Sequence, residues 1–333
     1  MKTVQFKDYG QPFQIVEVPT YNLERGQVLV KMAVASINPR DVSVRDGLFR
    51  HIPPPVGPSS NIVGLEGAGI VVASADEQQI YPVGSAVFFR QAYHLPQGGT
   101  WQEYVVATPR DLLPIPAGKT MFEAAAFRIP YHTALLALEK AGFRQDGGAD
   151  QIVFIPAVGS AVGNAAIQLV RACGVQEPVT TAGSTAKAER ARAMGYSKVI
   201  DLSQEKLVDG VRRLTNGAGV DVGIDMLGGP FTGQILSILK PGKTLVVCGL
   251  SAGAQATILI PELVGRGRNI SSLNVIFTPP AVQEPALERV SRFWQENRIT
   301  PLIEKVFHFT QAEEAQRYLT ENRPLGRVLL SFE

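Results

Sequence analysis

The chain has 333 residues, of which 45% are hydrophobic and 19% are charged, and its formal net charge is +2. At about 150 residues per domain, this length predicts two domains with large cores. The near-neutral charge, without a basic run, argues against nucleic-acid binding. We expect no secretory signal and no membrane contact. The first twenty residues lack an apolar segment, and no uncharged apolar stretch approaches the ~20 residues that cross a bilayer.

Cysteine is rare in this chain. The two cysteines, Cys173 and Cys248, exclude a disulfide framework and a cysteine-rich zinc site. Such sparse usage is typical of a reducing compartment, so we expect a cytoplasmic protein.

The first 120 residues are typical of an antiparallel β domain. Strand-like apolar stretches alternate there with turns rich in proline and glycine, and few segments have helical spacing. The expected strands lie within residues 27–37, 61–74, 85–93 and 100–109.

Residues 151–277 alternate short apolar runs with segments of helical period. Runs that are apolar on both faces and are separated by helices indicate a parallel sheet covered on both sides, and six of them match the size of a Rossmann fold. The runs cover residues 151–155, 178–183, 197–201, 220–226, 243–250 and 270–277. After residue 278 the pattern predicts a helix, a strand, a second helix and a last strand.

The first of these runs leads into a loop typical of a nucleotide site. A strand, a tight turn and a helix form the context in which backbone N–H groups bind a pyrophosphate. A strict G-x-G-x-x-G motif ending at Gly163 fails, because Val158 and Ser160 stand where glycines belong. An ordinary turn without a ligand is therefore the alternative. The residues expected at the pyrophosphate are Gly159, Ser160, Ala161, Val162 and Gly163.

The residues that follow the second apolar run indicate which of the two cofactors, NADP or NAD, the chain would bind. An NAD site places an acid about 20 residues past the loop, where it binds the ribose 2′-hydroxyl. Here Ser184, Lys187 and Arg190 occupy that stretch, and the first acid is Glu189. A hydroxyl and two cations suit a 2′-phosphate, so NADP(H) is favoured. The alternative is that these charges form a solvated helix face.

Eight short segments, taken in order, carry a family resemblance. Through them the chain resembles the medium-chain dehydrogenase/reductase superfamily, in its zinc-free quinone oxidoreductase and enoyl reductase branch, over essentially its whole length. The segments are Ser36 to Asp41 (N-P-x-D), Gly64 to Gly69 (G-x-E-x-x-G), Gly99 to Tyr104, Ala124 to Ala134, Ala157 to Gly163, Asp225 to Gly229, Pro241 to Lys243 and Gly326 to Leu330.

The resemblance implies a Rossmann doubly wound parallel α/β sheet inserted in a GroES-like antiparallel β domain, with the nicotinamide held between the two. We place the GroES-like catalytic domain at residues 1–121 and 278–333, and the NADP-binding domain at 122–277. The resemblance also implies a homodimer joined through the last Rossmann strand, residues 270–277. The further cofactor contacts that it implies are Thr133, Gly249, Asn274 and Arg327, with Asn38 toward the nicotinamide.

Zinc is excluded at the level of sequence. A catalytic zinc needs three ligands from cysteine, histidine or carboxylate side chains, and a structural zinc needs four. Where zinc-dependent relatives have a histidine in the G-x-E element, this chain has Leu65, and no cysteine lies near the N-P-x-D segment. We therefore expect no metal.

The proton donor that is usual in this branch is replaced. Relatives commonly carry a tyrosine ten residues after the proline of N-P-x-D, whereas this chain has Phe49. A general acid contributes roughly 10²–10⁴ in rate, and a phenyl ring cannot supply one. Phe49 is therefore expected in an aromatic substrate wall, or else in the core. The substitute donors open to consideration are Arg50, His51, Tyr93, Tyr131 and His132.

Two more polar residues are candidates for the active site. Asn38 is expected to bind cofactor or substrate, or else to form a turn before Pro39. Arg128, which stands among apolar residues, is expected to pair with an acid or to touch substrate.

Together with these patterns, the resemblance implies an NADPH-dependent, zinc-independent oxidoreductase of the NADPH:quinone reductase or alkenal/enone reductase type. It would transfer hydride to a quinone or to the C=C bond of an α,β-unsaturated carbonyl, a small electrophilic partner. One alternative is a 2-enoyl-thioester reductase with a substitute proton donor. Another is an NADP-binding protein without turnover.

Overall fold

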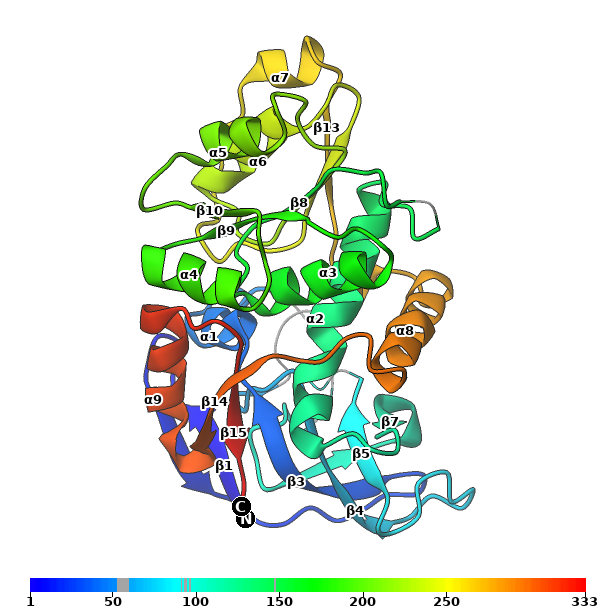
Figure 1. The fold of residues 1–333 in the computed structure, drawn as a ribbon. Coiled ribbons are helices and arrows are strands. Elements are labelled where there is room, and N and C mark those ends of the chain that lie inside the picture. Colours follow the sequence, from blue (N-terminus) through cyan, green and yellow to red (C-terminus); the bar gives the residue numbers. More distant parts are fainter. Residues whose placement is uncertain (53–59, 91, 93–94, 96, 147) are drawn as a thin grey trace. The chain divides into compact units, whose positions relative to one another are not determined.

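Two compact units make up the fold (Figure 1). The computed structural model describes residues 1–52, 60–90, 92, 95, 97–146 and 148–333. Unit 1 comprises residues 1–128 and 301–333, and unit 2 comprises residues 129–300, so the second unit is inserted in the first. The division falls inside the long helix α2 (Met121–Lys140). The predicted domain limits at 121/122 and 277/278 stay predictions.

Unit 1 is built on β-sheets, as the sequence predicts. Strands β1 and β2 form an antiparallel pair, and a larger sheet has the order β14-β15-β3-β4-β5-β7, with β6 paired to β3. Neighbours in this sheet are antiparallel, except that β14 and β15 run parallel. The strands are β1 (Lys2–Phe6), β2 (Phe13–Glu17), β3 (Val28–Ser36), β4 (Gly67–Ser74), β5 (Ala86–Phe89), β6 (Tyr104–Ala107), β7 (Leu112–Pro114), β14 (Ile303–His308) and β15 (Arg327–Ser331).

The helices of unit 1 are short. They are α1 (Pro39–Arg45), α9 (Ala312–Arg317), the 3₁₀ turns η1 (Pro109–Asp111) and η3 (Phe309–Gln311), and the π-helical turn η4 (Tyr318–Asn322). Apolar residues of β3, β4 and β5, among them Val30, Val71 and Phe89, are buried in one cluster. This cluster is the core of the larger sheet.

The glycine motifs of unit 1 pack segments distant in sequence against one another. A Cβ on Gly64, whose φ is +111°, would lie 2.4 Å from the Trp101 ring and 2.5 Å from the Thr100 hydroxyl. Thr100 donates to the Glu66 carbonyl (2.7 Å), and the Trp101 indole donates to the Ser36 carbonyl (3.1 Å). Three of the family segments thus interlock and determine where Glu66 lies.

Unit 2 is a parallel sheet with the strand order β10-β9-β8-β11-β12-β13. In chain order this is third, second, first, fourth, fifth and sixth, the doubly wound order of a Rossmann fold. The predicted fold class is confirmed. The strands are β8 (Val153–Ile155), β9 (Val179–Ala182), β10 (Val199–Asp201), β11 (Val222–Asp225), β12 (Thr244–Val247) and β13 (Asn269–Ser272).

Helices cover both faces of this sheet. Figure 1 shows α3 and α4 on one face and α5 and α6 on the other. Side chains such as Phe154, Ile200 and Leu236 fill the core beneath α5 and α6. The helices that lie wholly in unit 2 are α3 (Ala161–Ala172), α4 (Thr185–Ala193), α5 (Leu207–Leu214), α6 (Pro230–Ile238), α7 (Ile260–Val264), α8 (Pro280–Gln295) and the 3₁₀ turn η2 (Val275–Phe277).

The last predicted strand is shorter than expected. The sequence predicts a strand over 270–277, but β13 ends at Ser272 and a 3₁₀ turn occupies Val275–Phe277. The cause is local, because the Asn274 side chain accepts the Ile276 N–H (3.1 Å) and turns the chain. Among the residues described, none of the helices combines the length and apolar character that crossing a bilayer requires.

Candidate functional site

The order of the strands in unit 2 reverses between β8 and β11. From β8 the chain builds the sheet outward through β9 and β10, and from β11 it builds in the other direction. The loops after β8 and β11 therefore leave the same edge toward opposite faces, and at such a switch point open α/β sheets bind their ligands. The predicted nucleotide loop follows β8, so it lies at this switch point.

The loop after β8 is held by the neighbouring strand. Ala157 N–H donates to the Thr181 hydroxyl (2.9 Å), and Val158 N–H donates to the Thr181 carbonyl (2.9 Å). Ala157 has φ +55°, a left-handed backbone conformation that residues other than glycine seldom adopt. Thr181, at the end of β9, therefore shapes the loop, and the sequence motif did not reveal this role.

Helix α3 begins with its cap already in place. The Ser160 hydroxyl accepts the Gly163 N–H at 2.9 Å, and a hydroxyl that accepts one bond keeps its own proton to donate. The N–H groups of Ala161 and Val162 belong to the first turn, where no acceptor exists within the helix. Both residues are half-exposed. These donors suit an anion such as a pyrophosphate.

Gly163 is required for the close approach of α3 to the loop. A Cβ at this position would lie 2.4 Å from the Ala157 carbonyl oxygen and 2.7 Å from that of Pro156. The packing role of a third motif glycine therefore belongs to Gly163. Gly159, in the loop itself, is half-exposed.

The predicted 2′-phosphate residues lie at the same edge, after β9. Ser184 caps α4, and its hydroxyl accepts the Lys187 N–H at 3.4 Å. Lys187 is half-buried, and Arg190, one turn further along the helix, is exposed. Since β8 and β9 are parallel neighbours, the loops that carry Ser160 and Ser184 start side by side.

A second polar turn follows β11, across the switch point. The buried Asp225 carboxylate accepts N–H groups from Leu227 (2.8 Å) and Gly228 (2.9 Å) and the Thr232 hydroxyl (2.7 Å). Gly249, after β12, packs on this turn, because a Cβ on it would lie 2.3 Å from the Met226 carbonyl oxygen. Asp225 thus orders the loop on the other side of the switch point.

The remaining predicted cofactor residues of unit 2 are less accessible or serve another purpose. Thr133 lies in the middle of α2 and is buried. Asn274 is exposed, and its side-chain oxygen caps η2. For these two residues the cofactor role stays a prediction.

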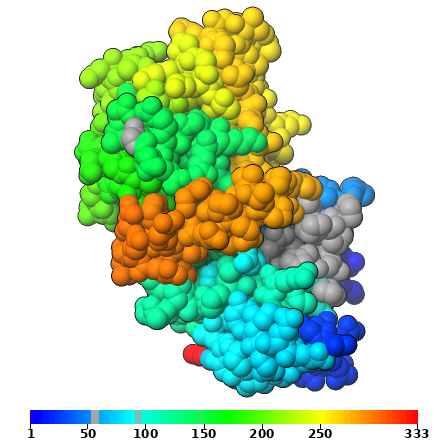
Figure 2. Space-filling view, turned by 90° about the vertical axis from the view of Figure 1, so that its right-hand side faces the viewer, coloured from blue at the N-terminus to red at the C-terminus, as the bar shows by residue number. Residues whose placement is uncertain are grey.

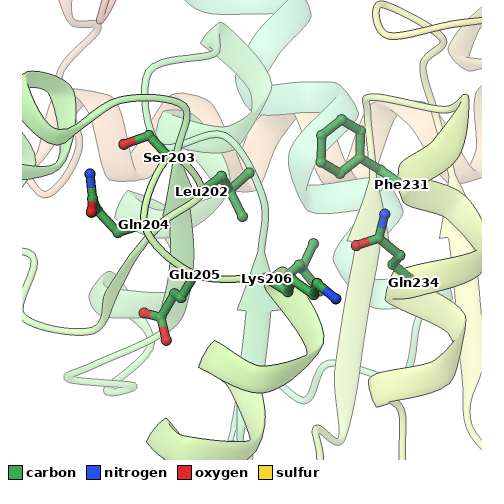
Figure 3. Close-up of a pocket in the computed structure, with 8 residues that line it drawn as sticks. Leu202, Ser203, Gln204, Glu205, Lys206, Phe231 and Gln234 are labelled. Atoms are coloured by element: carbon green, nitrogen blue, oxygen red, sulfur yellow. The ribbon is translucent and has the colours of Figure 1, made fainter.

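A separate pocket of about 390 Å³ opens beyond the end of β10. In Figure 3, Phe231 and Gln234 of α6 lie on one side of it and the segment from Leu202 to Lys206 lies on the other. None of the predicted cofactor residues lines this pocket. Beside it, the Asp201 carboxylate accepts hydrogen bonds from Ser203 (2.6 Å) and Thr185 (2.6 Å), and these bonds lower its pKa.

In unit 1, Asn38 and Arg327 lie together in a buried polar cluster. The Arg327 guanidinium donates to the Asn38 side-chain oxygen (2.9 Å) and to the Glu66 carboxylate (2.6 Å). Ser36 donates to the same carboxylate (3.1 Å), and the Asn38 amide donates to Ser36 (3.3 Å). Arg327 is 5% exposed and Glu66 is 2% exposed. The sequence motif named Glu66 without revealing this buried ion pair.

The N-P-x-D segment forms the start of α1. Asn38 is the N-cap, Pro39 is the first helical residue, and the Asp41 carboxylate accepts the Asn38 N–H (2.7 Å) and the Gly64 N–H (3.2 Å). The turn interpretation of Asn38 and its participation in a polar cluster thus both hold. Its catalytic role, like that of the buried Arg128 in α2, stays a prediction.

Phe49 is half-buried and contacts a cation. The Arg40 guanidinium carbon lies 4.3 Å from the centroid of the Phe49 ring. Arg40 is the second residue of α1, directly after Pro39. It was not among the predicted site residues.

The substitute proton donors have different surroundings. Arg50 Nε contacts His51 Nε2 (2.9 Å) on the exposed side of unit 1. In α2, Tyr131 is buried and burial raises its pKa, and the buried His132 ring contacts the Gln283 carbonyl (3.0 Å). Tyr93 lies outside the described residues.

The described residues offer no ready ligand set for a catalytic zinc, and the absence of a metal stays a prediction. Leu65 is buried at the position where a zinc-dependent relative has histidine. Within the described ranges, no three side chains of histidine, cysteine, aspartate or glutamate are grouped to hold a metal ion, whereas a catalytic zinc needs three such ligands.

Two families match the two units in turn. The family described as "Alcohol dehydrogenase GroES-like domain" matches residues 24–117, and the one described as "Zinc-binding dehydrogenase" matches residues 161–292. Together the two matches cover more than half of the chain. The chain belongs to the medium-chain dehydrogenase/reductase superfamily. The members of this superfamily are oxidoreductases that bind a nicotinamide dinucleotide.

Individual members of the superfamily resemble the chain over most of its length. The human "Synaptic vesicle membrane protein VAT-1 homolog" is 28% identical, over 92% of this chain and 79% of that protein. "Quinone oxidoreductase-like protein 2" of Bos taurus is 27% identical, over 97% and 90%. A solved "NAD-dependent alcohol dehydrogenase" has a TM-score of 0.85 at 26% identity, over 100% of both chains.

Proposed function

We propose that this member of the medium-chain dehydrogenase/reductase superfamily is an NADPH-dependent, zinc-free reductase. It would transfer hydride to a quinone or to the C=C bond of an α,β-unsaturated carbonyl. The observation that carries the proposal is the edge of unit 2, where two serine-capped helices begin side by side after β8 and β9. The nicotinamide cofactor, when bound, supplies the hydride.

The residues of this edge fit such a cofactor. The first-turn N–H groups of Ala161 and Val162, together with the Ser160 hydroxyl, would bind the pyrophosphate. Gly163 admits the close approach, because any side chain there would strike the loop backbone. We propose Gly159, Thr133, Gly249 and Asn274 as further contacts.

The choice of NADP over NAD rests on the start of α4. Ser184 and Lys187 would bind the 2′-phosphate, with Arg190 one turn beyond. Lys187→Ala should weaken NADPH binding about 10–100-fold, the value of a hydrogen bond to a charged group, and should leave NADH binding almost unchanged. Cofactor fluorescence titration measures both, with Lys198→Ala as a control at a surface ion pair with Glu177. Equal losses for the two cofactors would refute the 2′-phosphate assignment.

The acceptor class is the second part of the proposal. Phe49 supplies no proton, which favours quinones and activated alkenes whose products take a proton from water. NADPH oxidation against a panel of quinones, enals and enoyl thioesters would test it. Fastest turnover of the thioesters would favour the enoyl-thioester reductase. Cofactor binding without turnover on any acceptor would favour the non-catalytic alternative.

Zinc independence is tested directly. We expect purified protein to contain less than one zinc per chain by elemental analysis, and NADPH oxidation to be unaffected by a chelator. Loss of turnover with a chelator, restored by zinc, would overturn this part of the proposal.

We also propose a homodimer joined at β13, the edge strand of the unit 2 sheet. Ile270 on this strand and Phe277 after it are exposed apolar side chains, and the nearby α7 exposes Ile260 and Val264. Figure 2 shows the yellow-to-orange part of the chain, which includes these segments, forming much of one surface of unit 2. Ile270→Lys should shift the mass in light scattering from dimer to monomer. An unchanged dimer would exclude β13 as the contact.

A cytoplasmic location is the last part of the proposal. Both cysteines are free thiols. Burial and the nearby Asp225 raise the pKa of the Cys248 thiol to about 12. Unpaired, unreactive cysteines suit a reducing compartment. Fractionation of cells with an antibody to the protein would test the location.

A further inference from the structure

The pocket of about 390 Å³ beyond β10 lies within unit 2, away from the proposed cofactor donors. It is bounded by the segment that leads into α5 and by the first turns of α6. In Figure 1, α5 and α6 cover one face of the sheet, whereas α3 and α4, whose first turns carry the proposed cofactor donors, cover the other. The pocket is therefore a candidate site for a second ligand.

Apolar side chains form part of the pocket lining. Leu202 and Phe231 are half-buried, because each packs against the core beneath α5 and α6 and leaves part of its surface outside that core. Figure 3 shows these two side chains on opposite sides of the pocket. Apolar surface in a concave site and the face of an aromatic ring both favour a flat aromatic ligand.

Two polar groups of the lining are available to a ligand. Lys206 is exposed, and among the described residues its ammonium has no hydrogen bond or ion pair. In Figure 3 this ammonium points toward the side of the pocket that carries Gln234. The Gln234 amide donates one N–H to the Pro230 carbonyl (3.0 Å), so its second N–H remains for another acceptor.

The acid in the lining is already neutralised. The Glu205 carboxylate accepts two hydrogen bonds from the Arg213 guanidinium, at 2.5 and 3.3 Å. Lys206 is then the uncompensated charge among the described lining residues. One cation and one amide donor match a carboxylate, which has a single charge and two oxygens. A phosphate monoester, with a charge of about −1.5 to −2, would need further donors.

The segment that carries Lys206 is held in place without a ligand. The Asp201 carboxylate accepts the N–H (3.0 Å) and the hydroxyl (2.6 Å) of Ser203. The Asp201 carbonyl oxygen accepts the N–H groups of Gln204 and Glu205, both at 3.0 Å. A wall that is ordered in advance reduces the entropy lost when a ligand binds.

We propose that this pocket binds a small, flat aromatic carboxylate, at a site separate from the proposed cofactor edge. The ring would pack against Leu202 and Phe231, and the carboxylate would accept hydrogen bonds from Lys206 and Gln234. The site does not depend on the proposed function, because binding requires neither a cofactor nor hydride transfer.

Binding of 2-naphthoate to the protein without cofactor tests the site. This ligand is flat and fluorescent, and 2-naphthamide is an uncharged analogue of similar shape. We expect 2-naphthoate to bind with a Kd of about 0.1–1 mM, as its size allows. We expect 2-naphthamide to bind about three- to fivefold more weakly, the contribution of an exposed ion pair. Lys206→Gln should weaken 2-naphthoate by about the same factor and leave 2-naphthamide unchanged.

Two further variants test the ring and the amide. Phe231→Leu should weaken both ligands about fivefold, because it removes the aromatic face and keeps an apolar side chain. Gln234→Leu should weaken 2-naphthoate about threefold through the loss of one hydrogen bond. Lys198→Gln removes a surface cation that is paired with Glu177, so it is the matched control and should leave both affinities unchanged. Circular dichroism and thermal unfolding verify that each variant is folded.

NADP⁺ distinguishes a separate site from the cofactor site. At saturating NADP⁺ the Kd of 2-naphthoate should stay within about twofold, since independent sites have no coupling free energy. An apparent Kd that rises in proportion to the NADP⁺ concentration would overturn the separate site.

The remaining outcomes are equally decisive. Absence of saturable 2-naphthoate binding, or equal 2-naphthoate affinity in wild type and Lys206→Gln, would overturn the proposal. If Phe231→Leu does not fold, Lys206→Gln and the 2-naphthamide comparison still decide it. If the protein binds 2-naphthoate through Lys206 but does not bind NADP⁺, the proposed function fails and the aromatic carboxylate site stands.

Discussion

The candidate cofactor edge of unit 2 and the buried polar cluster of unit 1 are formed by different chemical groups. At the edge of unit 2, the candidate ligand groups are backbone N–H donors and short hydroxyls, and Gly163 lets them converge. In unit 1 the polar cluster is built on two long charged side chains, Arg327 and Glu66, which are paired at 2.6 Å in the interior and bonded to Ser36 and Asn38.

This difference decides how each region tolerates change. A backbone site depends on where the chain runs, so residue types can vary while the loop keeps its path, as Val158 and Ser160 do here in place of glycines. A buried charged cluster depends on each partner, because removal of one leaves the other desolvated and unpaired. Substitutions in each region test this contrast.

The largest effect is expected at Glu66. Glu66→Ala leaves the buried Arg327 cation without its carboxylate and should cost about 3–5 kcal/mol of unfolding free energy, measured in urea. Glu77→Ala removes an acid from the exposed pair with Arg25 and should cost less than about 1 kcal/mol. Equal losses of unfolding free energy in Glu66→Ala and Glu77→Ala would contradict the larger contribution expected of the buried ion pair.

Gly163→Ala comes next. Its Cβ would sit 2.4 Å from the Ala157 carbonyl oxygen, so the loop or helix must move, at a cost of about 1–3 kcal/mol. NADPH affinity should fall more than about tenfold, because a shift of the donors costs at least one hydrogen bond to a charge. Gly183→Ala is the matched control at the same edge, where nothing lies within 4 Å of the added Cβ. Undiminished NADPH binding in Gly163→Ala would contradict a backbone-built site.

Thr181 and Thr180 differ in whether the side-chain hydroxyl makes a hydrogen bond. Thr181→Val removes the acceptor of the Ala157 N–H and should cost about 1–3 kcal/mol. Thr180 is buried and, within the described part of the chain, its hydroxyl has no hydrogen-bond partner. Thr180→Val should therefore leave urea unfolding unchanged or stabilise the fold. A larger loss at Thr180 than at Thr181 would refute the role of Thr181 in shaping the loop.

The smallest effect is a pH dependence at Asp201. Hydrogen bonds from Ser203 and Thr185 lower its pKa, so the ionised carboxylate stabilises the fold above its ordinary pKa, and this stabilisation is lost as pH falls through the folded value. Ser203→Ala should lower Tm at neutral pH, and the difference from wild type should shrink as the solution becomes acidic. A difference that grows toward acid pH would contradict the direction of the shift.

The sequence predicted the elements of the fold better than their ends and contacts. The six runs of unit 2 appear as six parallel strands, because burial on both faces leaves a plain apolar signature. The strand predicted over 270–277 was too long. The hydrogen bond from the Ile276 N–H to the Asn274 side chain turns the chain after β13, and apolar periodicity does not reveal such a bond.

Around the candidate sites, residues whose partners are near in sequence were also easier to predict than residues whose partners are distant. The local roles of Ser160, Ser184 and Gly163, as helix caps and a packing glycine, depend on residues nearby in sequence and could be anticipated, whereas their cofactor contacts stay predictions. Glu66, Thr181 and Arg40 were not predicted as site residues. Their partners Arg327, Ala157 and Phe49 lie 261, 24 and nine positions away along the chain.

By itself, the sequence determined the strand and helix types, the doubly wound sheet inserted in a β domain and the superfamily. These follow from periodicity, turn chemistry and short motifs, all of which are local. Only the tertiary structure decided that Arg327 lies against Glu66 and that Arg40 lies over Phe49. The physical reason is that the cost of burying a charge and the orientation of a cation depend on which distant side chains surround it, and the folded backbone sets those neighbours.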